Sequence, residues 1–268
     1  MFSKCNYFTP LLRNYGLTHA MVKRDIISRY KGSVLGVLWS FINPLMMLGI
    51  YTFVFQYIFK AKWGDAREIT ANFASIMFAG LLIHMWFAEV VTRSINMITG
   101  NVNYVKKVIF PLEILGWNII LSSAVQFMCG LIVLALVIVI FGGDLHLNMF
   151  LLPLALVPFV FFLIGCVYLI STLSVFFRDI EQVVNTSLTM LLFTSTIFFP
   201  IDSVPSFLQD IIKINPLTVP VETIRSIIFG MHGFNISDFI AYTVFSFLFS
   251  ILSYLFFTRM KNSFSDVI

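Results

Sequence analysis

The side chains best suited to binding chemistry form a basic cluster ahead of the first long apolar segment. Arg24, Arg29 and Lys31 lie close together, and Tyr30 stands between the last two. Guanidinium and ammonium groups can hold a phosphate or diphosphate, and each contributes about 1 kcal/mol of attraction to anionic headgroups at a membrane surface. The same charges are also typical of a plain anchor that fixes the orientation of a first membrane span. The pattern therefore indicates either an anion-binding site or an anchor.

The sequence lacks the motifs with which a chain breaks covalent bonds or binds nucleotides by common devices. It has no G-x-x-x-x-G-K-[ST] phosphate loop, no H-E-x-x-H, no C-x-x-C and no G-x-S-x-G. The three cysteines are an odd number, and Cys129 and Cys166 lie in apolar runs that suit small hydrophobic side chains. We therefore expect no enzyme activity, cofactor or metal in this chain, and any energy from ATP must enter through another chain.

Ionisable side chains keep to the ends of the apolar segments. Glu89 and Glu113 fall near segment ends, Glu222 falls in a Pro-rich stretch, and His84 lies deeper, where it suits a hydrogen bond between packed helices. The segment interiors are polar only through neutral groups, namely Asn43, Gln56, Asn118, Ser122, Ser123 and Gln126. Ion-coupled transporters need ionisable groups near the middle of the membrane. This distribution argues against ion coupling and permits a path for an uncharged, hydroxyl-rich substrate.

Aromatic side chains are dense, with 31 Phe, 9 Tyr and 4 Trp. Tyr51, Phe55 and Phe59 follow one another at a spacing of four residues, which places them on one helix face. Aromatic faces suit the C–H faces of sugar rings. Tyr51 and Phe55 are therefore candidates for lining a glycan path, and packing between helices or against lipid is the alternative.

The composition shows which elements must position these residues. Of the 268 residues, 59% are apolar and only 11% are charged, against about 25% in soluble domains. Such a chain is a membrane protein, which excludes a soluble enzyme and a nucleic-acid-binding domain. A span takes about 20 helical residues, and the segments that meet this length are 34–59, 72–91, 112–141, 149–175 and 239–258, with 183–201 as a shorter sixth. The expected fold is all-α with six membrane-spanning helices.

The distribution of Lys and Arg predicts the orientation. With the N-terminus inside, the inner segments hold Lys4, Arg13, Lys23, Arg24, Arg29, Lys31, Arg93, Lys106, Lys107, Arg178, Arg259 and Lys261. The outer segments hold Lys60, Lys62, Arg67, Lys213 and Arg225. Because cytoplasmic loops carry the excess of positive charge, both termini are predicted to be cytoplasmic. The N-terminus lacks the apolar run of a cleaved signal peptide.

Two further segments complete the predicted topology. Leu11, Tyr15, Val22 and Ile26 recur near the helical period, which predicts an amphipathic helix at the inner membrane interface. Residues 202–237 are apolar but are broken by proline and glycine into pieces too short to span. We interpret them as an outer re-entrant helical hairpin between spans five and six, with a flat interfacial helix as the alternative. The chain is then a single transmembrane domain, with 1–33 interfacial, 34–258 the bundle and 259–268 a cytoplasmic tail.

Several short motifs resemble one known family. RDIISRYKGSVLGVLW at residues 24–39, followed by NPL at 43–45, resembles the start of the first span in permease subunits of ABC-type polysaccharide exporters. NYVKKVIFPLE at residues 103–113 is similar to that family's loop between spans two and three, and FRDI at 177–180 and NPL at 215–217 also match. The motifs extend over most of the chain, and together they are specific.

The resemblance implies a half-transporter of the bacterial inner membrane. It implies a second copy of the chain and two nucleotide-binding ATPase subunits as partners, together with membrane lipids and a lipid-linked polysaccharide. ATP and magnesium are then bound by the ATPase subunits. It implies that the N-terminal helix and the loop after span two contact the ATPase, with Tyr104, Lys106 and Lys107 as coupling residues. The shorter connection at residues 176–181, which contains Arg178, is the alternative coupling element.

The expected cargo is O-antigen linked to undecaprenyl diphosphate. Arg24, Arg29, Tyr30 and Lys31 would load the diphosphate, because a diphosphate at a low-dielectric portal needs compensating charge. Capsular polysaccharide and teichoic acid are alternative cargoes within the same family. An ion-coupled flippase and a membrane-embedded glycosyl- or acyltransferase are alternatives of other classes, and no nucleic acid is expected as a partner.

Overall fold

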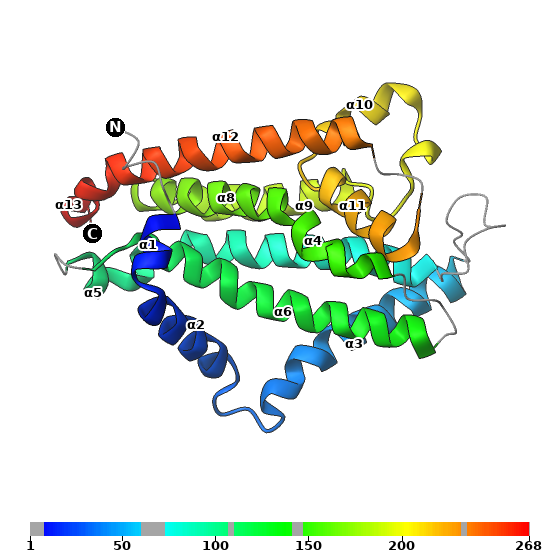
Figure 1. Ribbon diagram of the computed structural model, residues 1–268, viewed down its shortest axis with the longest axis horizontal. Helices are drawn as coiled ribbons and strands as arrows, with labels where there is room; N and C mark the ends of the chain where they lie inside the picture. The colour runs from blue at the N-terminus through cyan, green and yellow to red at the C-terminus, as the bar shows by residue number, and fades with distance from the viewer. Residues whose placement is uncertain (1–7, 60–72, 107–109, 141–146, 232–234, 268) are drawn as a thin grey trace.

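The computed structural model describes residues 8–59, 73–106, 110–140, 147–231 and 235–267, and the regular elements in these ranges are helices (Figure 1). The helices are α1 (Phe8–Arg13), α2 (Tyr15–Tyr30), α3 (Trp39–Tyr51), α4 (Phe73–Ile95), α5 (Val102–Val105), α6 (Glu113–Ile140), α7 (Leu152–Ala155), α8 (Val157–Phe176), α9 (Ile180–Phe193), α10 (Ser206–Ile214), α11 (Thr218–Phe229), α12 (Ile236–Met260) and α13 (Phe264–Val267). A π-helical segment, Thr52–Ile58, continues α3. The predicted all-α fold is confirmed for the described residues.

Five helical segments in the described ranges are long and apolar enough to cross a membrane. They are Gly36–Phe55, Phe73–Ile95, Glu113–Ile140, Asn148–Phe176 and Ile236–Ser263. They correspond to the five longer predicted spans, with ends that differ by a few residues. The predicted sixth segment, 183–201, is instead the 14-residue helix α9, which begins at Ile180 and ends at Phe193. At 1.5 Å per residue α9 reaches about 21 Å, less than the hydrocarbon thickness of about 30 Å.

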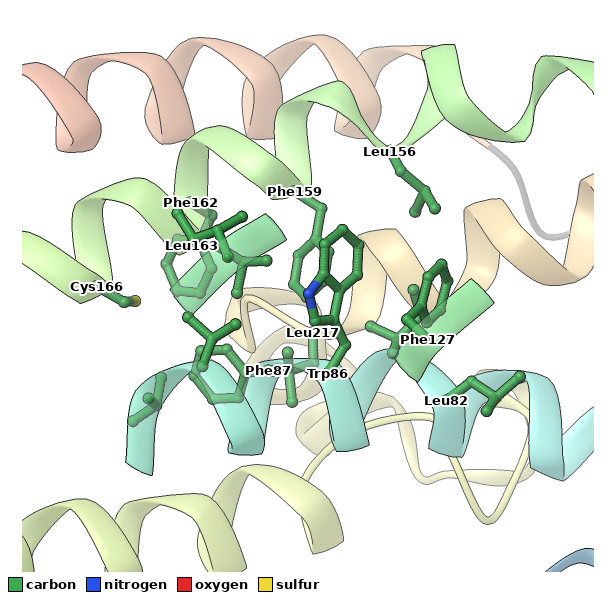
Figure 2. Packing of buried hydrophobic residues seen from close by; sticks show 14 of the residues in the cluster. Leu82, Trp86, Phe87, Phe127, Leu156, Phe159, Phe162, Leu163, Cys166 and Leu217 are labelled. Atoms are coloured by element: carbon green, nitrogen blue, oxygen red, sulfur yellow. The ribbon is translucent and has the colours of Figure 1, made fainter. Parts of the chain in front are cut away.

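Helix α4 is the centre of the bundle and is the most deeply buried span. It packs against α6, α8, α9 and α11. Figure 2 shows Trp86 and Phe87 of α4 among side chains from α6 and α8. The Trp86 ring stacks on Phe127 with centroids 4.7 Å apart and meets Phe159 edge-on at 5.5 Å. Aromatic pairs in these geometries add to the dispersion energy of a membrane core, where van der Waals packing drives helix association.

Close packing of α8 against α12 depends on a glycine. A Cβ atom on Gly165 would lie 2.3 Å from Cδ1 of Phe249, so no larger residue fits without movement of that ring. Three serines of α12, Ser246, Ser250 and Ser253, are buried along the same helix. Small residues of this kind let membrane helices approach closely.

Different short helices lie at the two ends of the bundle. Helices α1, α5 and α13 lie at one end, which we call the terminal end, and α10 and α11 lie at the other, which we call the hairpin end (Figure 1). Helix α3 packs on α6 but leaves much of its surface exposed, including Leu45 and Ile50, and Phe53 of its π-helical continuation is exposed as well. This surface is available to lipid or to another protein chain.

The N-terminal segment differs in detail from the predicted amphipathic helix. It consists of two helices, because Asn14 has φ −118° and ψ 35° and interrupts the helix between Arg13 and Tyr15. Thr18 and Met21 are the residues of α2 that are buried, whereas Tyr15 is 69% exposed. The face of α2 that packs on the bundle contains Thr18 and Met21 and lies beside the predicted apolar face. Polar contacts with α4 and α6 hold α2 in this orientation.

Candidate functional site

Three of the four residues predicted to load the diphosphate bind α2 to three other helices. Both terminal nitrogens of Arg24 lie 3.4–3.5 Å from the hydroxyl oxygen of Tyr104 in α5. Arg29 Nη2 donates to Glu89 Oε1 of α4 at 2.6 Å, and the Tyr30 hydroxyl donates to Gln126 Oε1 of α6 at 2.9 Å. Lys31 is exposed just beyond the end of α2. The predicted loading and coupling residues Arg24 and Tyr104 thus lie together.

Four charges of alternating sign, with one serine, form what we call the α2 charge network. Arg93 Nη2 donates to Asp25 Oδ2 at 2.5 Å, and Arg93 Nη1 lies 3.4 Å from Glu89 Oε1, which also accepts from Arg29. Arg93 Nη1 also donates to Ser122 Oγ of α6 at 2.8 Å. About a quarter of each charged side chain is exposed. The network therefore joins α2, α4 and α6 with no net charge.

The ionisation of Arg29 fits this arrangement. Burial lowers the pKa of Arg29, but the ion pair and hydrogen bond with Glu89, assisted by Tyr30 and Asp25, outweigh burial and raise the pKa above its ordinary value. The guanidinium is therefore charged at every physiological pH. Its charge is already balanced within the chain by Glu89.

A second polar contact closes the connection between α2 and α3. The Ser40 hydroxyl donates to the Tyr30 hydroxyl at 2.5 Å, and Gln126 Nε2 donates to the carbonyl oxygen of Ser40 at 3.1 Å. Between these anchors the chain turns through Gly32 and Gly36, which have φ of 87° and 52°. Positive φ is accessible to glycine without steric cost. The turn exposes a group of apolar side chains next to Lys31, namely Val34, Leu35, Val37 and Leu38.

The predicted coupling residues lie on the connection between α4 and α6. Tyr104 of α5 is half-buried and stacks on Phe110 with ring centroids 4.4 Å apart. Lys106 follows α5 and is exposed, whereas Lys107 lies outside the described residues. The connection therefore offers an exposed cation at the terminal end, and Tyr104 fixes it to α2.

The predicted glycan-path residues belong to an aromatic cluster at the far end of the first span. Phe55 stacks on Phe73 at 5.9 Å and on Phe198 at 5.8 Å, and its ring centroid lies 6.4 Å from that of Tyr51. Phe198 in turn stacks on Phe193 of α9. Tyr51 and Phe55 are half-buried, so one side of each ring packs within the chain. The cluster joins the first span to the end of α9.

A neutral polar stripe on α9 escaped the sequence reasoning. Gln182, Asn185, Thr186 and Thr189 recur at helical spacing and are exposed. They lie opposite the face on which Val184 is buried. The spacing i, i+3, i+4, i+7 is visible in the sequence, but segment 183–201 is noticed first because it is free of charge and rich in apolar residues.

His84 of α4 contacts the backbone of α9. Its Nε2 lies 3.2 Å from the Leu188 carbonyl oxygen, which agrees with its predicted packing role.

Among the described residues, the structure gathers no group of three His, Cys, Asp or Glu side chains that could hold a metal ion. The features that it does bring together are a charge network, a polar stripe and an aromatic cluster. These groups form non-covalent contacts with a ligand or with neighbouring helices.

Comparisons with known proteins identify the family of the chain. The sequence profile of the family described as ABC-2 type transporter matches residues 16–229. The O-antigen export system permease protein RfbA of Klebsiella pneumoniae is 26% identical over 256 residues, which cover 95% of each chain. RfbA of Myxococcus xanthus is 26% identical over 189 residues and covers 70% of each chain. The capsule polysaccharide export inner-membrane protein CtrC of Neisseria meningitidis is 25% identical over 240 residues, which cover 89% of this chain and 86% of CtrC. Since the family profile covers well over half of the sequence, this chain is a membrane-spanning permease subunit of the ABC-2 type transporter family.

Proposed function

We propose that this chain exports a lipid-linked polysaccharide across the bacterial inner membrane, with O-antigen on undecaprenyl diphosphate as the cargo. The likeness to O-antigen export permeases over 95% of both chains carries the assignment. Two copies of the chain would work with two ATPase subunits, which supply the ATP hydrolysis that this family leaves to a separate chain. Capsular polysaccharide is the second candidate, because capsule export proteins match most of the chain.

The polar stripe on α9 supports a path for a hydroxyl-rich substrate. Exposed side-chain amides such as those of Gln182 and Asn185 are unfavourable in hydrocarbon, where they lack partners. They would face a second copy of the chain across a hydrated path. Tyr51 and Phe55 stand near the end of α9, where an aromatic surface could slide along sugar rings.

Deletion of the gene for this chain in its host tests the assignment. Gel analysis of surface polysaccharides should show loss of the O-antigen ladder, and undecaprenyl-linked O-antigen should accumulate inside the cell. Loss of capsule with an intact O-antigen ladder would favour the second candidate. Export that persists after ATP depletion and stops when the proton gradient collapses would indicate an ion-coupled flippase instead.

Six spans with both termini in the cytoplasm complete the proposal. The placement of α1 and α13 at one end of the bundle supports an even number of spans, with α9 as the short fifth (Figure 1). The hairpin supports both earlier interpretations in part. Helix α11 is largely buried by protein, as in a re-entrant segment, whereas α10 exposes Phe207, Ile211 and Ile214, as in an interfacial helix.

Cysteine labelling should confirm this topology. In a cysteine-free background, Asp210→Cys in α10 should react with an impermeant maleimide in intact spheroplasts. Asn262→Cys, near the end of α12, should react only after the membrane is opened. Both native side chains are exposed, so accessibility within the protein does not decide the result. Labelling of Asn262→Cys but not Asp210→Cys in intact spheroplasts would invert the topology.

Loading of the diphosphate at Arg24, Arg29, Tyr30 and Lys31 stays a prediction. Glu89 already balances the charge of Arg29, so the structure favours Arg24 and Lys31 as the cations that meet the substrate. Arg24 contacts the neutral hydroxyl of Tyr104, and Lys31 is exposed beside the apolar turn. A lipid-linked diphosphate would find both charge and apolar surface there.

Charge reversal at Lys106 and Lys107 should uncouple the transporter from its ATPase. An exposed cation on the connection between α4 and α6 can bind an acidic surface of a partner, and reversal changes attraction into repulsion. We expect normal insertion, at least tenfold less export, and loss of the ATPase stimulation that lipid-linked oligosaccharide produces in the purified complex. Arg178→Glu serves as the matched control on the other connection. If Arg178→Glu abolishes stimulation and the Lys106 and Lys107 changes do not, coupling belongs to residues 176–181.

A further inference from the structure

A fully buried arginine holds the hairpin end together. Arg225 of α11 is 0% exposed. Its Nε donates to the carbonyl oxygen of Ile76 in α4 at 3.1 Å, and its two terminal nitrogens donate to the carbonyl oxygens of Thr196 and Ile197 at 2.6 and 2.8 Å. Glu222 Oε1 lies 3.2 Å from Nη1. One guanidinium therefore binds α11, α4 and the segment that follows α9.

Asn215 makes a parallel set of contacts from the turn between α10 and α11. Its Nδ2 donates to the Leu191 carbonyl oxygen at 3.0 Å and lies 2.9 Å from Thr194 Oγ1. Its Oδ1 accepts from the backbone N–H of Leu217 at 2.9 Å. The last carbonyls of a helix lack partners within the helix, so Asn215 caps α9. We call Arg225 and Asn215, with the carbonyl groups they bind, the end clamp.

The backbone of α4 leaves room for the end clamp at Gly80. A Cβ atom on Gly80 would lie 3.0 Å from Arg225 Nη2 and 3.1 Å from Val221 Cγ1. Helix α11 and its guanidinium thus pack directly against α4. Separation of these helices would leave a buried cation and several carbonyl oxygens without partners, which is costly in a low-dielectric environment.

Helix α10 is held much less firmly. Ile212 is its buried residue, whereas Phe207 and Ile214 are 73% and 81% exposed. On the basis of the proposed export function, we propose that the end clamp keeps α11 fixed to α4 and α9 throughout transport. Opening at the hairpin end then takes place by movement of α10. Arg225 and Asn215 are positioning residues for release of the cargo, and they need not touch it.

The first test separates the carbonyl contacts from the ion pair. Arg225→Gln should insert normally and lower export at least tenfold, while ATP hydrolysis by the purified complex continues. Arg225→Lys should be intermediate, since an ammonium group cannot reach all three carbonyls in the fork geometry of arginine. Glu222→Gln, the matched control, keeps the carbonyl contacts and should export within twofold of the parent. Equal export by Arg225→Gln and Glu222→Gln would overturn the proposal.

A reversible covalent link tests the rigidity directly, even if the Arg225 variants fail to fold. Gly80→Cys and Val221→Cys, placed in a chain without its three native cysteines, should form a disulfide between α4 and α11. Oxidation should leave export by this chain unchanged and should restore export in the Arg225→Gln background until a reductant is added. Loss of export on oxidation of the otherwise parental chain would show that α11 moves against α4, which contradicts the proposal. Absence of export by the parent itself would instead refute the proposed function.

Discussion

Reversal of either charge in the Arg29–Glu89 pair will lower export at least tenfold, and reversal of both will restore it. In Arg29→Glu the attraction to Glu89, about 1 kcal/mol for a partly exposed pair, becomes a repulsion of similar size. A total change of about 2 kcal/mol lowers the ratio of docked to undocked α2 about 30-fold. We expect at least a tenfold loss of surface polysaccharide with unchanged insertion.

The double reversal, Arg29→Glu with Glu89→Arg, is favourable between the helices. It gives α2 two carboxylates, at positions 25 and 29, and gives α4 two guanidinium groups, at positions 89 and 93, so that every pair across the interface is attractive. The new like-charge pairs within each helix, at i and i+4, cost only a few tenths of a kcal/mol. Export should therefore return to within about threefold of the parent. If Arg29 instead binds the substrate diphosphate, the double variant will stay inactive, and the anchoring role is wrong.

Lys23→Glu provides the matched control for this experiment. Lys23 lies on the same helix and is exposed, so its reversal changes the net charge of α2 by the same amount without touching Glu89. Near-normal export by Lys23→Glu would attribute the defect of Arg29→Glu to the network. An equal defect would point to the general positive charge of the N-terminal segment as the active feature.

Conversion of the α9 stripe to leucine will stop export without loss of the protein. Asn185→Leu with Thr189→Leu removes groups that can form hydrogen bonds worth about 1 kcal/mol each with passing hydroxyls, and adds bulk to the surface. Leucine is favourable in a membrane helix, so insertion should be normal or improved. We expect at least a tenfold fall in surface polysaccharide, measured with the amount of inserted protein in the same membranes.

Two controls on α9 sharpen this result. Val183→Leu and Met190→Leu change exposed apolar residues of the same helix and should leave export within twofold of the parent. Thr189→Ser keeps a hydroxyl and should also be tolerated. Normal export by the double leucine variant would mean that the stripe packs against another chain and does not line the path.

Most of the fold could be predicted from hydropathy, because few kinds of backbone structure can cross a membrane. Segments such as 72–91 and 239–258 are long and mostly apolar, and their helices α4 and α12 begin and end within a few residues of them. The misjudged element is α9. Its charge-free segment continues to residue 201, but the helix ends at Phe193, where Asn215 from a distant turn binds the Leu191 carbonyl group. Such a tertiary cap leaves no signal in the local sequence.

The candidate site could be predicted only in part from the sequence, because the type of a residue does not show which other residue its side chain contacts. Arg24, Arg29 and Tyr30 stand out as a basic and aromatic cluster, but their contacts with Tyr104, Glu89 and Gln126 join residues 60 to 96 positions apart. Arg225 counted as an outer loop charge, although it is the largest fully buried side chain in the described chain. Only tertiary structure distinguishes a solvated arginine from a structural one.

The α2 charge network also determines when α2 can dock on the other helices during synthesis. During synthesis α2 leaves the ribosome long before its partners, since Glu89 follows Arg29 by 60 residues and Ser122 follows Arg93 by 29. Until α4 emerges, Asp25 and Arg29 lack their partners on that helix, Arg93 and Glu89. Docking of α2 is therefore a late step in biogenesis, and a chain truncated before α4 will hold its N-terminal helix on the membrane without a fixed orientation.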